Sequence, residues 1–159
     1  MSNALRTIEF LALGLWLGSD VFLSFVVAPG AFRVLASRDQ AGAIVGHSLW
    51  CMHMIGVVCG FVLLTARLVR TAAPMSLVQP AALCVVMMIA LTVVSQHAVS
   101  PRMADLRVKM GSIEATAEGS PLLAEFGKWH RVSVMLESGV LLAGIAGTWF
   151  MVREAALRT

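Results

Sequence analysis

The stretch Ile8 to Ala28, IEFLALGLWLGSDVFLSFVVA, decides the class of this protein. As a helix rising 1.5 Å per residue it reaches roughly 30 Å, the hydrocarbon thickness of a bilayer. The rest of the chain is similarly apolar: 58% of its residues are hydrophobic, 13% are charged, and the mean hydropathy is +0.84. Soluble domains contain about 25% charged residues. The 159-residue sequence therefore predicts a single-domain integral membrane protein.

Three further apolar runs follow, so we predict an all-α polytopic protein with four transmembrane helices in a bundle. The predicted spans cover residues 8–28, 41–68, 78–99 and 124–152. Pro101 is expected to end the third span, because proline lacks the N–H that a helix interior needs. Residues 102–118 place Met103, Leu106 and Met110 on one side and charged residues on another. This pattern predicts an amphipathic surface helix between the third and fourth spans.

The charge distribution and the first span bear on location. The net charge of +3 comes from residues at the ends of the predicted spans, which indicates membrane anchoring and no nucleic-acid partner. The first apolar run contains Asp20 and exceeds the apolar core of a signal peptide, so we expect it to be retained as a span. The small size and the unprocessed start favour a multi-pass protein of a cell membrane, specifically a bacterial inner membrane.

Small residues recur at four-residue spacing on three of the predicted spans. Such faces are typical of helices that approach a neighbour closely in a membrane. They are Gly14 with Gly18, Gly56 with Gly60, and Gly139 with Ala143 and Gly147. Besides the lipid bilayer, these faces predict a partner in the form of a second copy of the chain or a larger membrane complex.

Polar side chains interrupt the apolar runs at similar depths. In Trp129 to Glu137, WHRVSVMLE, the residues His130, Ser133 and Glu137 share one helix face. Connections 29–40 and 100–123 lie on the same side of the membrane, and depth can be counted from the span ends that meet them. The depths are roughly 12 Å for Asp20, 18 Å for His53 and 20 Å for Glu137. An ionisable group in lipid costs at least a few kcal/mol unless it is paired or faces water, so we predict one polar layer.

This layer has three interpretations. Its side chains can simply hydrogen-bond across helices and set their pairing. They can instead form a site that binds or translocates a proton, an ion or a small solute, with Asp20 and Glu137 changing charge, and this is the functional interpretation we favour. Alternatively, the protein is an accessory subunit of a larger membrane complex, in which a histidine ligates a metal, haem or pigment.

A second pattern concerns cofactors and catalysis. The stretch HSLWCMHM contains the soft ligands that suit copper, and His47, Cys51 and Met54 share a face whereas His53 points elsewhere. Copper or haem is thus a candidate cofactor, although the sequence requires none. The chain has no H-E-x-x-H, no phosphate-binding glycine loop and no CxxC. We therefore expect no enzyme.

Three motifs resemble the transmembrane protein 205-like family: LWLGSDVFLSFVVAPGAF (residues 15–32), SPR (100–102) and FGKWHRVSVMLESGV (126–140). The resemblance extends over nearly the whole chain. It implies a four-helix transmembrane fold with a surface segment before the last helix, and it implies no reaction. Its pattern positions are Pro29, Phe32, Pro101, Arg102, His130 and Ser133. Asp20 and Glu137 depart from the pattern, which tends to have a small or apolar residue and an asparagine at these positions.

Overall fold

The computed structural model describes residues 2–157, and every regular element in that range is helical. Four helical stretches are long and apolar enough to cross a membrane, namely Asn3–Val34, Arg38–Thr71, Pro80–Met110 and Pro121–Ala156. The predicted all-α bundle with four membrane-spanning helices is therefore confirmed.

Two of these stretches are composite. The first consists of α1 (Ser2–Phe22), the π-helical turn η1 (Leu23–Val27) and α2 (Ala28–Val34). The third consists of α4 (Pro80–Val94), the π-helical turn η3 (Ser95–Val99) and α5 (Ser100–Met110). The second and fourth are α3 (Arg38–Thr71) and α6 (Pro121–Ala156), and a short 3₁₀ helix, η2 (Pro74–Val78), precedes α4.

Each π-helical turn ends two residues before a proline, and this explains why these spans are longer than predicted. The N–H of Ala28 bonds to the carbonyl of Leu23 before Pro29, and the N–H of Ser100 bonds to that of Ser95 before Pro101. The wider turn accommodates a residue that would otherwise break the helix. The third helix therefore continues to Met110, and residues 102–118 do not form the separate surface helix that the sequence predicted.

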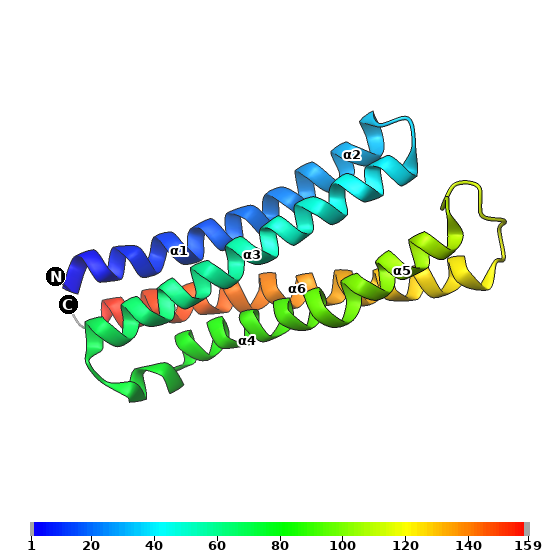
Figure 1. The fold of residues 1–159 in the computed structure, drawn as a ribbon. Coiled ribbons are helices and arrows are strands. Elements are labelled where there is room, and N and C mark those ends of the chain that lie inside the picture. The colour runs from blue at the N-terminus through cyan, green and yellow to red at the C-terminus, as the bar shows by residue number, and fades with distance from the viewer. Residues whose placement is uncertain (1, 158–159) are drawn as a thin grey trace.

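The helices are arranged as two pairs, α1 beside α3 and α4 beside α6 (Figure 1). The pairs lie close together at the end that carries both termini and connection 72–79, which we call the terminal end. They diverge toward the opposite end, which carries connections 35–37 and 111–120 and which we call the loop end (Figure 1).

The apolar core occupies the terminal half, where the pairs are in contact. Trp16 of α1 is 1% exposed and lies against α3 at Gly56, where an added Cβ would be 2.3 Å from the indole Nε1. Gly60 and Gly147 similarly face Ile89 and Cys84 of α4. The small-residue faces of α3 and α6 are thus used inside the bundle.

The third small-residue face behaves differently. An added Cβ at Gly14 or at Gly18 would meet no atom within 4 Å, so this side of α1 faces outward. Of the three faces predicted to contact a partner, only this one remains uncovered in the described part of the chain.

Candidate functional site

A hydrogen-bonded cluster joins three helices at the point where the pairs begin to diverge. His53 of α3 is fully buried, with its Nδ1 2.8 Å from Gln96 Oε1 and its Nε2 2.9 Å from Glu137 Oε1. Ser95 donates a second hydrogen bond to the same Glu137 oxygen at 2.9 Å. The structure thus brings together His53 and Glu137, two members of the layer predicted from sequence.

Asp20 of α1 is the fourth helix's contribution to this cluster. It is 2% exposed, and Ser24 donates a hydrogen bond of 3.3 Å to its Oδ1. It borders the same cavity as Gln96 and Glu137. We call the set Asp20, Ser24, His53, Ser95, Gln96 and Glu137 the midmembrane cluster. Asp20 Oδ2 and Glu137 Oε2 are buried in it without a hydrogen-bond partner.

The midmembrane cluster contains three ionisable side chains, Asp20, His53 and Glu137. The two ring nitrogens of His53 face the side-chain oxygens of Gln96 and Glu137, and the tautomer of the ring decides which nitrogen donates. Two carboxyl groups and one imidazole at one place give the cluster several groups that can take up or release a proton.

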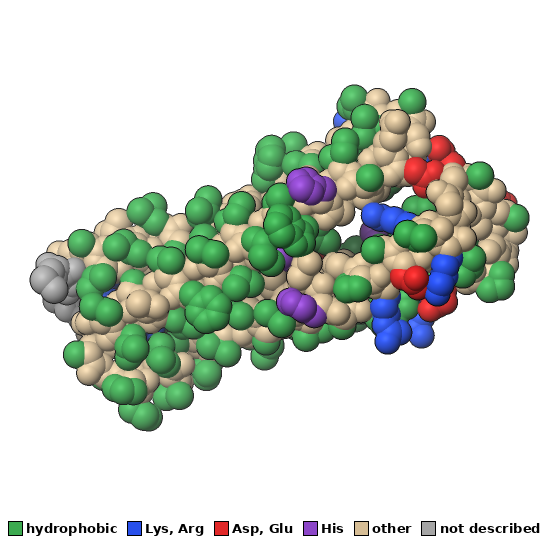
Figure 2. All heavy atoms as spheres, in the orientation of Figure 1, with side chains coloured by type: hydrophobic (Ala, Val, Ile, Leu, Met, Phe, Trp, Pro, Cys, Tyr) green, Lys and Arg blue, Asp and Glu red, His purple; other side chains and the backbone are tan. Residues whose placement is uncertain are grey.

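A cavity of about 990 Å³ lies between the two helix pairs in the loop half. Asp20, Gln96 and Glu137 line its inner end, and its walls are largely apolar, with contributions from Phe25, Phe32, Leu49, Trp50 and Leu141. Figure 2 shows that the hollow opens on the flank of the bundle, between the two pairs. We call it the flank cavity. Its size is at the upper end of the range for organic ligands, about 300–1,000 Å³, and far exceeds what an ion needs.

The two helix pairs are connected again at the loop end. Asp39 of α3 accepts hydrogen bonds from Ser112 Oγ at 2.5 Å and from the Ile113 backbone N–H at 2.8 Å. Ser37 donates to Glu114 at 3.2 Å. These contacts hold the diverging pairs together next to the flank cavity, and the visible opening of the cavity lies on the side of the bundle (Figure 2).

The other residues singled out in the sequence are distributed around this cavity. His130, Ser133 and His47 line it without a hydrogen bond to the midmembrane cluster. The Sγ of Cys51 is 3.7 Å from His47 Nε2, whereas His53 faces the midmembrane cluster and Met54 is 37% exposed. Among residues 2–157, no three His, Cys, Asp or Glu side chains are grouped to hold a metal ion, and the copper or haem site stays a prediction.

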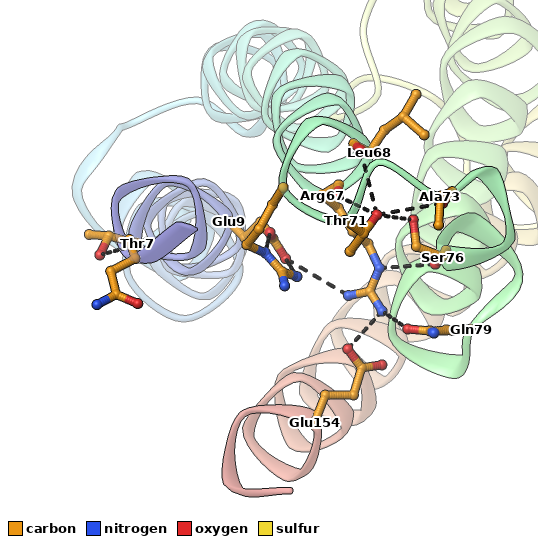
Figure 3. Close-up of polar contacts among 11 residues, drawn as sticks. Thr7, Glu9, Arg67, Leu68, Thr71, Ala73, Ser76, Gln79 and Glu154 are labelled. Carbon is orange, nitrogen blue, oxygen red and sulfur yellow. Dashed lines mark hydrogen bonds and ion pairs between the residues drawn. The ribbon is translucent and has the colours of Figure 1, made fainter. Parts of the chain in front are cut away.

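A second buried polar group lies at the terminal end (Figure 3). Arg67 of α3 is 1% exposed and donates to the Ser76 carbonyl at 3.0 Å, to Gln79 at 2.6 Å and to Glu154 of α6 at 2.7 Å. Glu9 of α1, also 1% exposed, lies 3.8 Å from the Arg67 guanidinium and is bound by Arg70 through both oxygens. We call Glu9, Arg67, Arg70, Gln79 and Glu154 the terminal network.

Sequence reasoning did not find the terminal network or the role of Gln96. The available signal was depth: Glu9, Arg67 and Glu154 each lie a few residues from the terminal end of a span, so opposite charges recur at one level. For Gln96 the signal was a polar residue in a mostly apolar span, but its partner His53 is 43 residues away in the sequence.

Comparison with known proteins gives one match. The family model described as a domain of unknown function, DUF4149, matches residues 11–112. No curated protein and no solved structure matches the chain. The matched region includes Asp20, His53 and Gln96 and ends before Glu137. Because it covers more than half of the sequence, the chain belongs to the DUF4149 family of domains of unknown function.

Proposed function

We propose that this protein is a binding or translocation protein for a small organic solute. The solute binds in the flank cavity, and a proton is exchanged at the midmembrane cluster. The observation that carries the proposal is the position of the cluster. The buried carboxyl group of Asp20, the mostly buried one of Glu137 and the imidazole of His53 lie at the inner end of a cavity of about 990 Å³, and one oxygen of each carboxyl group has no hydrogen-bond partner. Ionisable groups within the spans of a membrane protein commonly mark the pathway of a substrate, an ion or a proton.

The arrangement of the helix pairs supports translocation. The flank cavity is confined to the half in which the pairs diverge, while the apolar core around Trp16 and the terminal network close the other half. Many transporters work by rocking one bundle against another around a fixed site near the membrane midplane. A movement of the α1 and α3 pair against the α4 and α6 pair would expose the midmembrane cluster to the terminal end.

Proton flux tests this proposal. We expect liposomes containing the protein and a trapped pH-sensitive dye to equilibrate an imposed pH gradient faster than protein-free liposomes. Asp20→Asn and Glu137→Gln should each reduce that flux to the protein-free level, because an amide keeps the side-chain shape but cannot carry the exchanged proton.

Two matched variants serve as controls. Asp105→Asn on α5 and Glu125→Gln on α6 make the same chemical changes at exposed positions outside the cavity lining, and both should conduct like the wild type. The proposal is wrong if wild-type protein adds no flux, or if Asp20→Asn and Glu137→Gln conduct as well as the two controls.

A second candidate is the accessory subunit with a metal or pigment ligand. It is favoured by the contact between His47 and Cys51, beside which Trp50 stacks on the His47 ring at a centroid distance of 6.3 Å. Metal analysis and an absorption spectrum of detergent-purified protein distinguish the two, since only the accessory role requires bound copper or haem. With the main proposal we retain a non-catalytic role, a bacterial inner membrane location and the finer resemblance to the transmembrane protein 205-like family.

A further inference from the structure

We propose that Arg107 is an anion-binding subsite of the flank cavity, and that the ligand is a membrane lipid whose phosphate lies on this guanidinium while an acyl chain follows the apolar walls. The inference rests on the proposed binding function of the cavity and specifies the class of ligand. It is carried by a guanidinium without an ion pair in the described range, at the wall of a cavity that opens on the side of the bundle.

The guanidinium of Arg107 has no anionic partner in the described range. Its Nε is buried without a hydrogen-bond acceptor, and its centre lies 5.5 Å from the Phe126 ring. The nearby carboxylate of Asp39 acts on it electrostatically but forms no hydrogen bond with it, and the two Asp39 oxygens accept hydrogen bonds from Ser112 and Ile113. A partly buried cation without a partner is costly, so an anion from outside the chain is expected to complete it.

The backbone of α3 accommodates this side chain. Arg107 extends from α5 across to α3, where an added Cβ would be 3.3 Å from its Nη2 at Gly42 and 3.1 Å from its Nη1 at Gly46. The guanidinium is therefore held between an aromatic ring and two glycines. A guanidinium presents up to five donors in a planar fork, which suits two oxygens of one phosphate group.

The depth of Arg107 fits a lipid headgroup. On the same helix, Lys109 and Asp105 form an exposed ion pair 2.7 Å long, a pattern typical of the level at which a span reaches the membrane surface. Gly46, beside the guanidinium, and His53 are seven residues apart on α3, or about 10 Å along the helix axis. A lipid of that leaflet has the same polarity, with its phosphate at the surface and its chain directed inward past the apolar walls.

Lipid-dependent stability tests this subsite. Thermal unfolding of detergent-purified protein is followed while phosphatidylglycerol, which is anionic, or phosphatidylcholine is added. We expect phosphatidylglycerol to raise the unfolding midpoint of the wild type. Arg107→Gln should need at least about tenfold more phosphatidylglycerol for the same rise, because a charge-assisted pair is lost. Arg107→Lys should recover part of the response, since it keeps the charge but not the fork.

The matched control is Arg102→Gln, which removes a cation from the same helix outside the cavity, where Arg102 lies 4.7 Å from the Trp129 ring. It should respond to phosphatidylglycerol like the wild type. If Arg107→Gln does not fold, Gly46→Leu replaces it, because a leucine there occupies the position of the guanidinium and should cause the same loss.

Three results would overturn the inference: an equal response to phosphatidylcholine, an unchanged response in Arg107→Gln, or stabilisation by inorganic phosphate alone that matches phosphatidylglycerol. The last result identifies a free anion in place of a lipid. The proposed function is tested independently of this subsite. Asp20→Asn should abolish proton flux but keep the response to phosphatidylglycerol.

Discussion

Replacing Arg67 with leucine is expected to lower the free energy of unfolding by about 3–5 kcal/mol, the usual cost of removing one partner from a buried ion pair. Arg67 connects three parts of the chain at the terminal end, α3 itself, Gln79 and Glu154 of α6. Without it, Glu154 loses its cation and the Gln79 and Ser76 acceptors lose their donor. Unfolding in mixed micelles, followed by circular dichroism as the denaturing detergent fraction rises, measures the change.

Arg153→Leu is the control for this prediction. It removes a guanidinium from the same end of the bundle, where Arg153 is exposed and lies 4.8 Å from the Trp149 ring. It should change the free energy of unfolding by less than about 1 kcal/mol, as exposed charges usually do. Equal losses for the two variants would show that the terminal network contributes no more than an exposed charge.

Gly56→Leu is expected to disrupt the packing of α1 on α3 and to cost at least about 3 kcal/mol, the upper range for overpacking a filled core. Even the first carbon of the new side chain would lie 2.3 Å from the Trp16 indole nitrogen and 2.5 Å from the adjoining ring carbon. Trp16 is 1% exposed and lies in the apolar core, so its ring can move only by displacing other core side chains. The two helices must separate, and the same unfolding titration reports the loss.

Gly14→Leu on α1 makes the identical substitution on a helix face that meets no atom within 4 Å. It should leave monomer stability unchanged or raise it by up to about 1 kcal/mol, since the position is open and leucine is a better helix former than glycine. A loss comparable to that of Gly56→Leu would mean that Gly14 is covered in the folded protein, for example by a second copy of the chain.

Several local features of the fold could be predicted from single segments. Ser37 and Ser120 are the N-caps of α3 and α6, with Pro121 at the first helical position, and these follow from residue types next to each other in the sequence. The depth of His53 and Glu137 also follows from counting along straight helices. The extent of the third span could not be predicted in this way, because the π-helical turn before Pro101 allows the helix to continue to Met110.

The partners in the candidate site required the packed bundle. His53 bonds to Gln96 and Glu137, which are 43 and 84 residues away, and helix periodicity gives a face to each residue but no neighbour. The same limit applies to Arg107. The sequence predicted it to lie in a surface helix and gave no sign that its side chain extends from α5 to Gly42 and Gly46 of α3.

Composition and hydropathy alone determine that this chain is a four-span membrane protein, because the length of an apolar run and the bilayer thickness are both one-dimensional quantities. Only the tertiary structure decides that the helices form two pairs that diverge at the loop end and that a cavity lies between them. The divergence depends on how particular side chains pack, with Trp16 against glycines in one half and an unpaired Arg107 in the other. No periodicity along the chain encodes such contacts.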